Sequence, residues 1–143
     1  FHQKRVAVNI YGYSWGCGWG AKKLAYELWW RGIDVTYMVL SDPVYRHWYP
    51  LGNWRAFANH PLLKWLFRPV IRITPNVGTV ISFYQTIDWP RAHKLEADST
   101  STVILNPIEV KASHLKMDEA KTYHDWALAA AQALHSGTGL PIP

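Results

Sequence analysis

A serine framed by two glycines lies between an apolar segment and a helical pattern near the start of the chain. Gly12, Ser14 and Gly16 form the pattern Gly-x-Ser-x-Gly. In enzymes with a serine nucleophile this pattern forms a tight strand-to-helix turn, where the glycines leave room and the hydroxyl is exposed. The pattern is common by chance, so its meaning depends on the strand before it and the helix after it. We therefore predict that Ser14 is a nucleophile and that the backbone N–H of Trp15 is one donor of an oxyanion hole.

A serine hydroxyl needs a base within hydrogen-bond reach, and a histidine is the usual choice. The chain has seven histidines. His114 directly follows the last predicted strand, where a loop can return it to the serine, so we favour it as the base. His93, in a polar loop, and His124, in a C-terminal helix, are the alternatives.

The base in turn needs an acid that fixes its tautomer and stabilises its protonated form. Asp42 directly follows the second predicted strand, and Asp88 lies four residues beyond Tyr84. We favour Asp42, because a residue at the end of a strand is held more rigidly than one in a loop. Asp88 stays open as the alternative, and either aspartate can also simply cap a turn.

The elements that must position these residues follow from the hydrophobic pattern. Residues 5–11 read as a continuous apolar strand that is covered on both faces, and residues 34–40 read as a second strand. A helix is predicted between them, ending at Gly32, from apolar residues at helical spacing: Ala21, Leu24, Ala25 and Leu28. This strand–helix–strand unit predicts a parallel pair, with Ser14 and Asp42 at the same edge of the sheet.

The rest of the chain continues the α/β pattern. The predicted segments are strands over residues 70–73, 77–84 and 102–110, with the last one bent at Asn106 and Pro107, a polar loop over 85–100, and a helix over 118–135 with an acidic start. The fold class we expect is α/β, with a mostly parallel sheet flanked by helices. We treat residues 1–143 as a single domain or as the C-terminal part of one.

Residues 45–69 interrupt the regular pattern with a dense group of aromatic residues and prolines. We interpret this segment as an insertion, either a lid over a binding cleft or a satellite hydrophobic cluster. Trp48, Trp54 and Trp65 are candidates to line a carbohydrate or acyl cleft.

Composition narrows the classes of function. The formal charge of +5 is spread along the chain without a basic run, so no nucleic-acid partner is expected. Cys17 is the single cysteine, which excludes an intrachain disulfide and a cysteine-based zinc site, and we interpret it as a buried apolar residue. No apolar run approaches the length of a transmembrane helix, and the chemistry considered above needs neither cofactor nor metal.

Four short segments carry a resemblance to a known family. These are residues 10–16 around the serine, 39–44 with Asp42 before Pro43, 83–85, and 113–115 before an acidic helix start. Over most of residues 5–135 the chain resembles the C-terminal half of an α/β-hydrolase of lipase or esterase type. The resemblance implies that Ser14 is the nucleophile, Asp42 the orienting acid and His114 the base. It also implies that strands carrying the second oxyanion donor precede residue 1.

Two functions are compatible with this sequence. The first is a serine hydrolase that cleaves a carboxylic ester, with a lipid or an acylated sugar as the substrate. The second is a non-catalytic structural or binding domain on the same scaffold within a larger assembly. An N-terminal polypeptide that completes the fold is a further expected partner. We expect a soluble chain that is cytoplasmic or, since members of the family that it resembles occur in bacteria and their viruses, associated with a particle.

Overall fold

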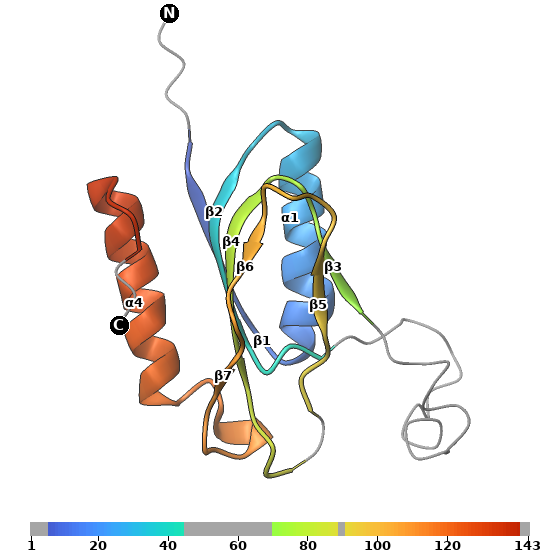
Figure 1. Cartoon of the computed structure of the whole chain (residues 1–143), viewed down its shortest axis with the longest axis vertical. Helices are drawn as coiled ribbons and strands as arrows, with labels where there is room; N and C mark the ends of the chain where they lie inside the picture. Colours follow the sequence, from blue (N-terminus) through green and yellow to red (C-terminus); the bar gives the residue numbers. More distant parts are fainter. Residues whose placement is uncertain (1–5, 45–69, 89–90, 141–143) are drawn as a thin grey trace, which may run out of the picture.

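A parallel sheet with one helix on each face forms the frame of the molecule (Figure 1). The computed structural model describes residues 6–44, 70–88 and 91–140. Its main sheet has the order β1 (Val8–Tyr13), β2 (Val35–Ser41), β4 (Val77–Tyr84) and β6 (Val103–Ile104), and β7 (Ile108–Glu109) also pairs with β4. Every pairing is parallel, as is that of β3 (Ile71–Ile73) with β5 (Leu95–Ala97) in a second, two-stranded sheet. The expected α/β arrangement is therefore confirmed at this level.

Each face of the main sheet has its own hydrophobic core. Because side chains alternate along a strand, Met38 and Leu40 of β2 point to one face, and Tyr37 and Val39 point to the other. The first face is covered by the helix that follows β1 and by the β3–β5 sheet. The second face is covered by α4 (Lys121–Ser136), through Tyr123, Trp126, Ala130 and Ala133. Burial on both faces explains why apolar residues are consecutive at the centre of each strand, over residues 37–40 in β2 and 80–81 in β4.

The first strand differs from its prediction. It runs from Val8 to Tyr13 rather than over 5–11, and among the described residues it pairs with β2 alone. Ile10 is its one buried side chain and Tyr11 is exposed, yet both faces of β1 have neighbours: Ile10 lies in the first core, and the side chains of Asn9 and Tyr11 donate to backbone carbonyls of α4. The apolar sequence of a strand does not fix the number of strands that pair with it, because tertiary neighbours decide the pairing.

The helix after β1 begins as a π-helix, η1 (Gly16–Ala21), and continues as α1 (Lys22–Trp30). A π-helical turn has more residues than an α-helical turn, and it therefore changes which residues face the core. Cys17, Ala21 and Ala25 are buried, but Leu24 is 48% exposed, contrary to the α-helical spacing of the prediction. Gly32 ends this helix with a φ of 67°, the left-handed conformation that favours glycine.

Three further bounds differ from the sequence pattern. The expected loop 85–100 contains β5, and the expected strand 102–110 is divided into β6 and β7 on either side of Asn106 and Pro107. The C-terminal helix begins at Lys121 rather than at residue 118, after the short 3₁₀ helix η2 (His114–Lys116). The predicted insertion 45–69, with its cleft candidates Trp48, Trp54 and Trp65, lies outside the described residues.

Candidate active site

Ser14 occupies the turn between β1 and η1. Its φ of 52° lies in the left-handed region, which is unfavourable for a residue with a Cβ atom. The turn is held by backbone hydrogen bonds: the N–H of Ser14 donates to the carbonyl of Ser41, and its own carbonyl accepts from Cys17 and Val44. The strained conformation is therefore fixed by the surrounding backbone.

The two glycines around Ser14 are not equivalent. A Cβ atom on Gly12 would lie 3.1 Å from Sγ and 3.3 Å from Cα of Cys17, so the glycine is what lets η1 approach β1 closely. A Cβ atom on Gly16 would meet no atom within 4 Å. The expectation that both glycines relieve a clash thus holds for Gly12 and is wrong for Gly16.

Asp42 follows β2 as Ser14 follows β1. In the parallel register Tyr13 is paired with Ser41, so the two next residues emerge side by side at the carboxyl edge of the sheet. Asp42 also has a positive φ, 44°, and its N–H donates to the carbonyl of Phe83 on β4. Its side chain is fully buried, which removes water as a competing partner for the carboxylate.

His114 joins Ser14 to Asp42. Its Nε2 atom lies 2.7 Å from Oγ of Ser14, and its Nδ1 atom lies 2.5 Å from Oδ2 of Asp42. An ionised carboxylate can only accept, so Nδ1 carries the proton and Nε2 is left to accept from the serine hydroxyl. The structure therefore brings together the three side chains that the sequence singled out at positions 14, 42 and 114.

The backbone and ring of His114 are held by two further side chains. The Tyr13 hydroxyl donates to the His114 carbonyl at 2.5 Å, and the two rings stack at a centroid distance of 5.4 Å. The His114 N–H donates to Oδ1 of Asp88 at 2.7 Å. Asp88, the alternative acid, thus contacts the backbone of the histidine, whereas Asp42 contacts its ring.

The alternative histidines have other surroundings. The backbone N–H of His93 donates to the carbonyl of Pro43, and burial lowers the pKa of its imidazole from the ordinary value. His124 lies on α4, with its ring edge-on to Tyr123. Of the three candidate histidines, His114 is the one whose ring lies within hydrogen-bond distance of the Ser14 hydroxyl.

Trp15 is at the start of η1, directly after the serine. Its indole is 39% exposed and stacks on Trp19 at 5.6 Å. Its N–H belongs to the first turn of a helix, where backbone donors and the helix dipole favour negative charge. Cys17, two residues further on, is buried, and its thiol donates to the carbonyl of Ser41, which fits the interpretation as a packed residue.

Sequence reasoning missed two residues of this site, and Gln85 is the first. It directly follows β4, and its amide nitrogen donates to Oδ2 of Asp42 at 3.1 Å. The signal was present in the pattern, because Gln85 is the first residue after the central parallel strand β4, which lies next to the strand that Asp42 follows. Tyr13 was also missed, since a tyrosine at the end of a strand has no distinctive pattern.

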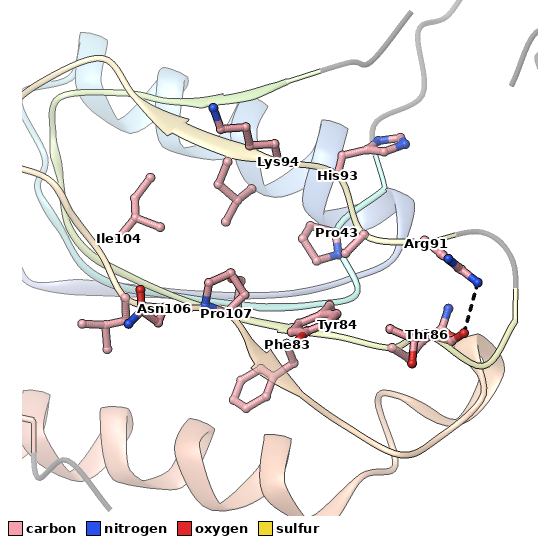
Figure 2. Close-up of a pocket in the computed structure, with 15 residues that line it drawn as sticks. Pro43, Phe83, Tyr84, Thr86, Arg91, His93, Lys94, Ile104, Asn106 and Pro107 are labelled. Carbon is pink, nitrogen blue, oxygen red and sulfur yellow. Dashed lines mark hydrogen bonds between the residues drawn. The ribbon is translucent and has the colours of Figure 1, made fainter. Parts of the chain in front are cut away.

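A cavity of about 590 Å³ lies beside Pro43, between β4 and the segment that leads into β5 (Figure 2). Pro43, Gln85, His93 and Ile104 are among its lining residues, and Ser14 and His114 are not. It is therefore distinct from the space in front of the serine hydroxyl.

Within residues 6–44, 70–88 and 91–140, histidine, cysteine and acidic side chains form no cluster suited to a metal ion. In the same ranges no helix has both the length and the apolar character needed to cross a membrane. Comparison of the chain with protein-family models, with curated proteins and with solved structures gave no match.

Proposed function

We propose that this chain is a serine hydrolase of α/β-hydrolase type that cleaves carboxylic esters. The observation that carries the proposal is the continuous hydrogen-bonded chain from Ser14 through His114 to the buried carboxylate of Asp42. Nucleophile, base and orienting acid in this geometry are the minimal machinery for acyl transfer to a serine. A lipid or an acylated sugar is the substrate class that we propose.

In the proposed reaction Ser14 Oγ attacks the ester carbonyl carbon while His114 Nε2 takes the hydroxyl proton. The backbone N–H of Trp15 donates to the oxygen that becomes negatively charged. The bond from the carbonyl carbon to the alkoxy oxygen then breaks, and His114 gives its proton to the departing alcohol. Water cleaves the acyl-serine in the same way, with its proton returned through His114 to Ser14. Asp42 stabilises the positively charged imidazole in both halves.

The strained backbone supports the same assignment. Among the described residues, Ser14 and Asp42 are the two non-glycine residues with positive φ. Such strain costs on the order of 1–3 kcal/mol per residue and tends to persist where function requires it. Both strained residues contact His114 through their side chains, at its two ring nitrogens.

The test is covalent labelling of the full chain with a fluorophosphonate, followed by hydrolysis of p-nitrophenyl esters of increasing acyl length. We expect labelling at Ser14 that is lost in S14A, and a rate that falls by about 10³–10⁴-fold in D42N. The matched control is S41A, because the buried Ser41 hydroxyl has no hydrogen-bond partner in the part of the chain described and lies one residue from Asp42. Absence of labelling in the wild-type chain would contradict the proposal.

An exposed aromatic surface favours the second function, a binding domain without turnover. Five large aromatic side chains on the η1–α1 helix are exposed, with Trp30 at 70%: Trp15, Trp19, Tyr26, Trp29 and Trp30. Exposed apolar patches of this kind are typical of interaction surfaces. A wild-type chain that resists the fluorophosphonate but is folded would support this function over the first.

A further inference from the structure

We propose that Gln85 and Asp88 are positioning residues that together fix the acid and the base of the site. We call this pair the Gln85–Asp88 clamp. The inference rests on the proposed hydrolase function, since it assigns a role within the same site. It explains why a second aspartate lies next to His114 without contacting its ring.

The first half of the clamp is the amide of Gln85, which is 1% exposed. Its nitrogen donates to Oδ2 of Asp42 and to the carbonyl of Asp88, at 3.1 Å in both cases. Its oxygen accepts the N–H of Asp88 at 2.9 Å. One side chain therefore connects the acid to the segment that carries Asp88.

The contact with Asp42 selects the orientation of its carboxylate. Oδ2 accepts from both His114 and Gln85, whereas Oδ1 has no hydrogen-bond partner within the described part of the chain. Two donors on one oxygen restrict the rotation of a buried carboxylate more than one donor does. Gln85 supplies the second donor and so keeps Oδ2 facing the imidazole.

The second half of the clamp is the carboxylate of Asp88. Its Oδ1 accepts the backbone N–H of His114 at 2.7 Å, in front of η2. This contact fixes the backbone from which the imidazole extends, so it acts on the distance from Nε2 to Ser14. An acceptor oxygen is sufficient for this contact, and a negative charge is not required.

The four residues close a ring of contacts. Asp42 bonds to the imidazole of His114, the His114 backbone to Asp88, the Asp88 backbone to Gln85, and Gln85 to Asp42. In a closed ring each contact restricts the geometry of the others, so loss of one member loosens the pairing of Asp42 with His114. A displacement of a catalytic group by about 1 Å can lower the rate of the chemical step by about 100-fold.

The test compares kcat and KM for ester hydrolysis in the wild type and in three variants of the full chain, together with two control variants. We expect kcat to fall about 10- to 100-fold in Q85M and in D88A, with KM nearly unchanged. D88N keeps the acceptor oxygen and should restore kcat to within about threefold of wild type, unlike D42N. Q132M and D34A, at exposed positions outside this ring of contacts, are the matched controls.

A spectroscopic readout separates this proposal from the proposed function. The Nδ1 proton between His114 and Asp42 should give a far-downfield proton NMR signal in the wild type and in D88N, and it should weaken in Q85M and D88A. If the wild-type chain lacks hydrolase activity but the signals follow this order, the function fails and the clamp stands. A wild-type kcat and signal in Q85M, or equal losses in D88N and D88A, would overturn the clamp.

Discussion

Ser14 and Asp42 leave adjacent parallel strands with the same unusual backbone conformation, φ of 52° and 44°. The paired register of β1 and β2 directs both residues to the carboxyl edge of the sheet, and the positive φ turns each side chain toward His114. The two residues with strained backbones therefore hydrogen-bond to the same histidine, one at each ring nitrogen. This strain should be measurable in the stability of variants.

Relief of the strain at Ser14 should stabilise the protein. We expect the free energy of unfolding of S14G to be about 1 kcal/mol higher than that of S14A, because glycine adopts a positive φ without steric cost and alanine does not. The measurement is chemical denaturation of both variants. At Ser82, inside the extended strand β4, the order should reverse, with the glycine variant the less stable. Equal stabilities at position 14 would show that the strain is absent.

Gly12 and Gly16 should respond differently to alanine. The added Cβ at position 12 meets Cys17 at 3.1–3.3 Å, so η1 must shift away from β1, and we expect G12A to lose about 1–3 kcal/mol of unfolding free energy. G16A, with open space around the new atom, should stay within about 0.5 kcal/mol of wild type. Thermal and chemical denaturation check both values, and a G16A loss as large as that of G12A would contradict the packing described.

The hydroxyl of Tyr13 should contribute to turnover through the His114 carbonyl. Burial raises the pKa of Tyr13, so the hydroxyl stays a donor at neutral and mildly alkaline pH. We expect Y13F to keep the ring stacking but to lower kcat about 3- to 10-fold, the usual effect of one lost hydrogen bond. Y26F, at an exposed tyrosine, is the control. An unchanged kcat in Y13F would leave the hydroxyl without a role.

Cys17 should resist alkylation in the folded protein. Its side chain is 1% exposed, and burial raises the pKa of the thiol well above its ordinary value. Since the thiolate is the reactive form, iodoacetamide labelling should require opening of the structure. We expect labelling of the native chain to be slower than that of the urea-unfolded chain by about 10³-fold, as followed by mass spectrometry. Rapid native labelling would show that η1 is open.

His93 should make stability depend on pH. Burial lowers the pKa of His93 below its ordinary value of 6.5, partly offset by the nearby charge of Asp42. The unfolded chain therefore binds this proton more tightly, and the free energy of unfolding falls as the pH drops below about 6.5, until the folded form is protonated too. Denaturation curves between about pH 5 and pH 7 should show a smaller loss in H93Q than in wild type. Parallel pH dependence in the two proteins would contradict this expectation.

The sequence by itself determined the α/β arrangement and the edge of the sheet to which Ser14 and Asp42 belong. Both results follow from local patterns, because alternating strand and helix periods imply parallel pairing, and parallel pairing brings strand ends together. The close approach of η1 to β1 at Gly12 and the end of the helix at Gly32 likewise follow from local sequence patterns. Tertiary packing, by contrast, decided that β1 pairs with β2 alone among the described strands, that β3 pairs with β5, and that Leu24 is exposed.

The tertiary structure also decided which of the candidate side chains hydrogen-bond to one another in the site. From the sequence, Asp42 and Asp88 were both candidates for the acid, and three histidines were candidates for the base. Position along the chain favoured one residue of each type but did not show which side chains are in contact. The choice depends on hydrogen bonds between residues 26 to 100 positions apart, such as those of His114 with Asp88 and Ser14. No local pattern encodes such contacts, since side-chain direction at a strand end is set by the neighbours that pack around it.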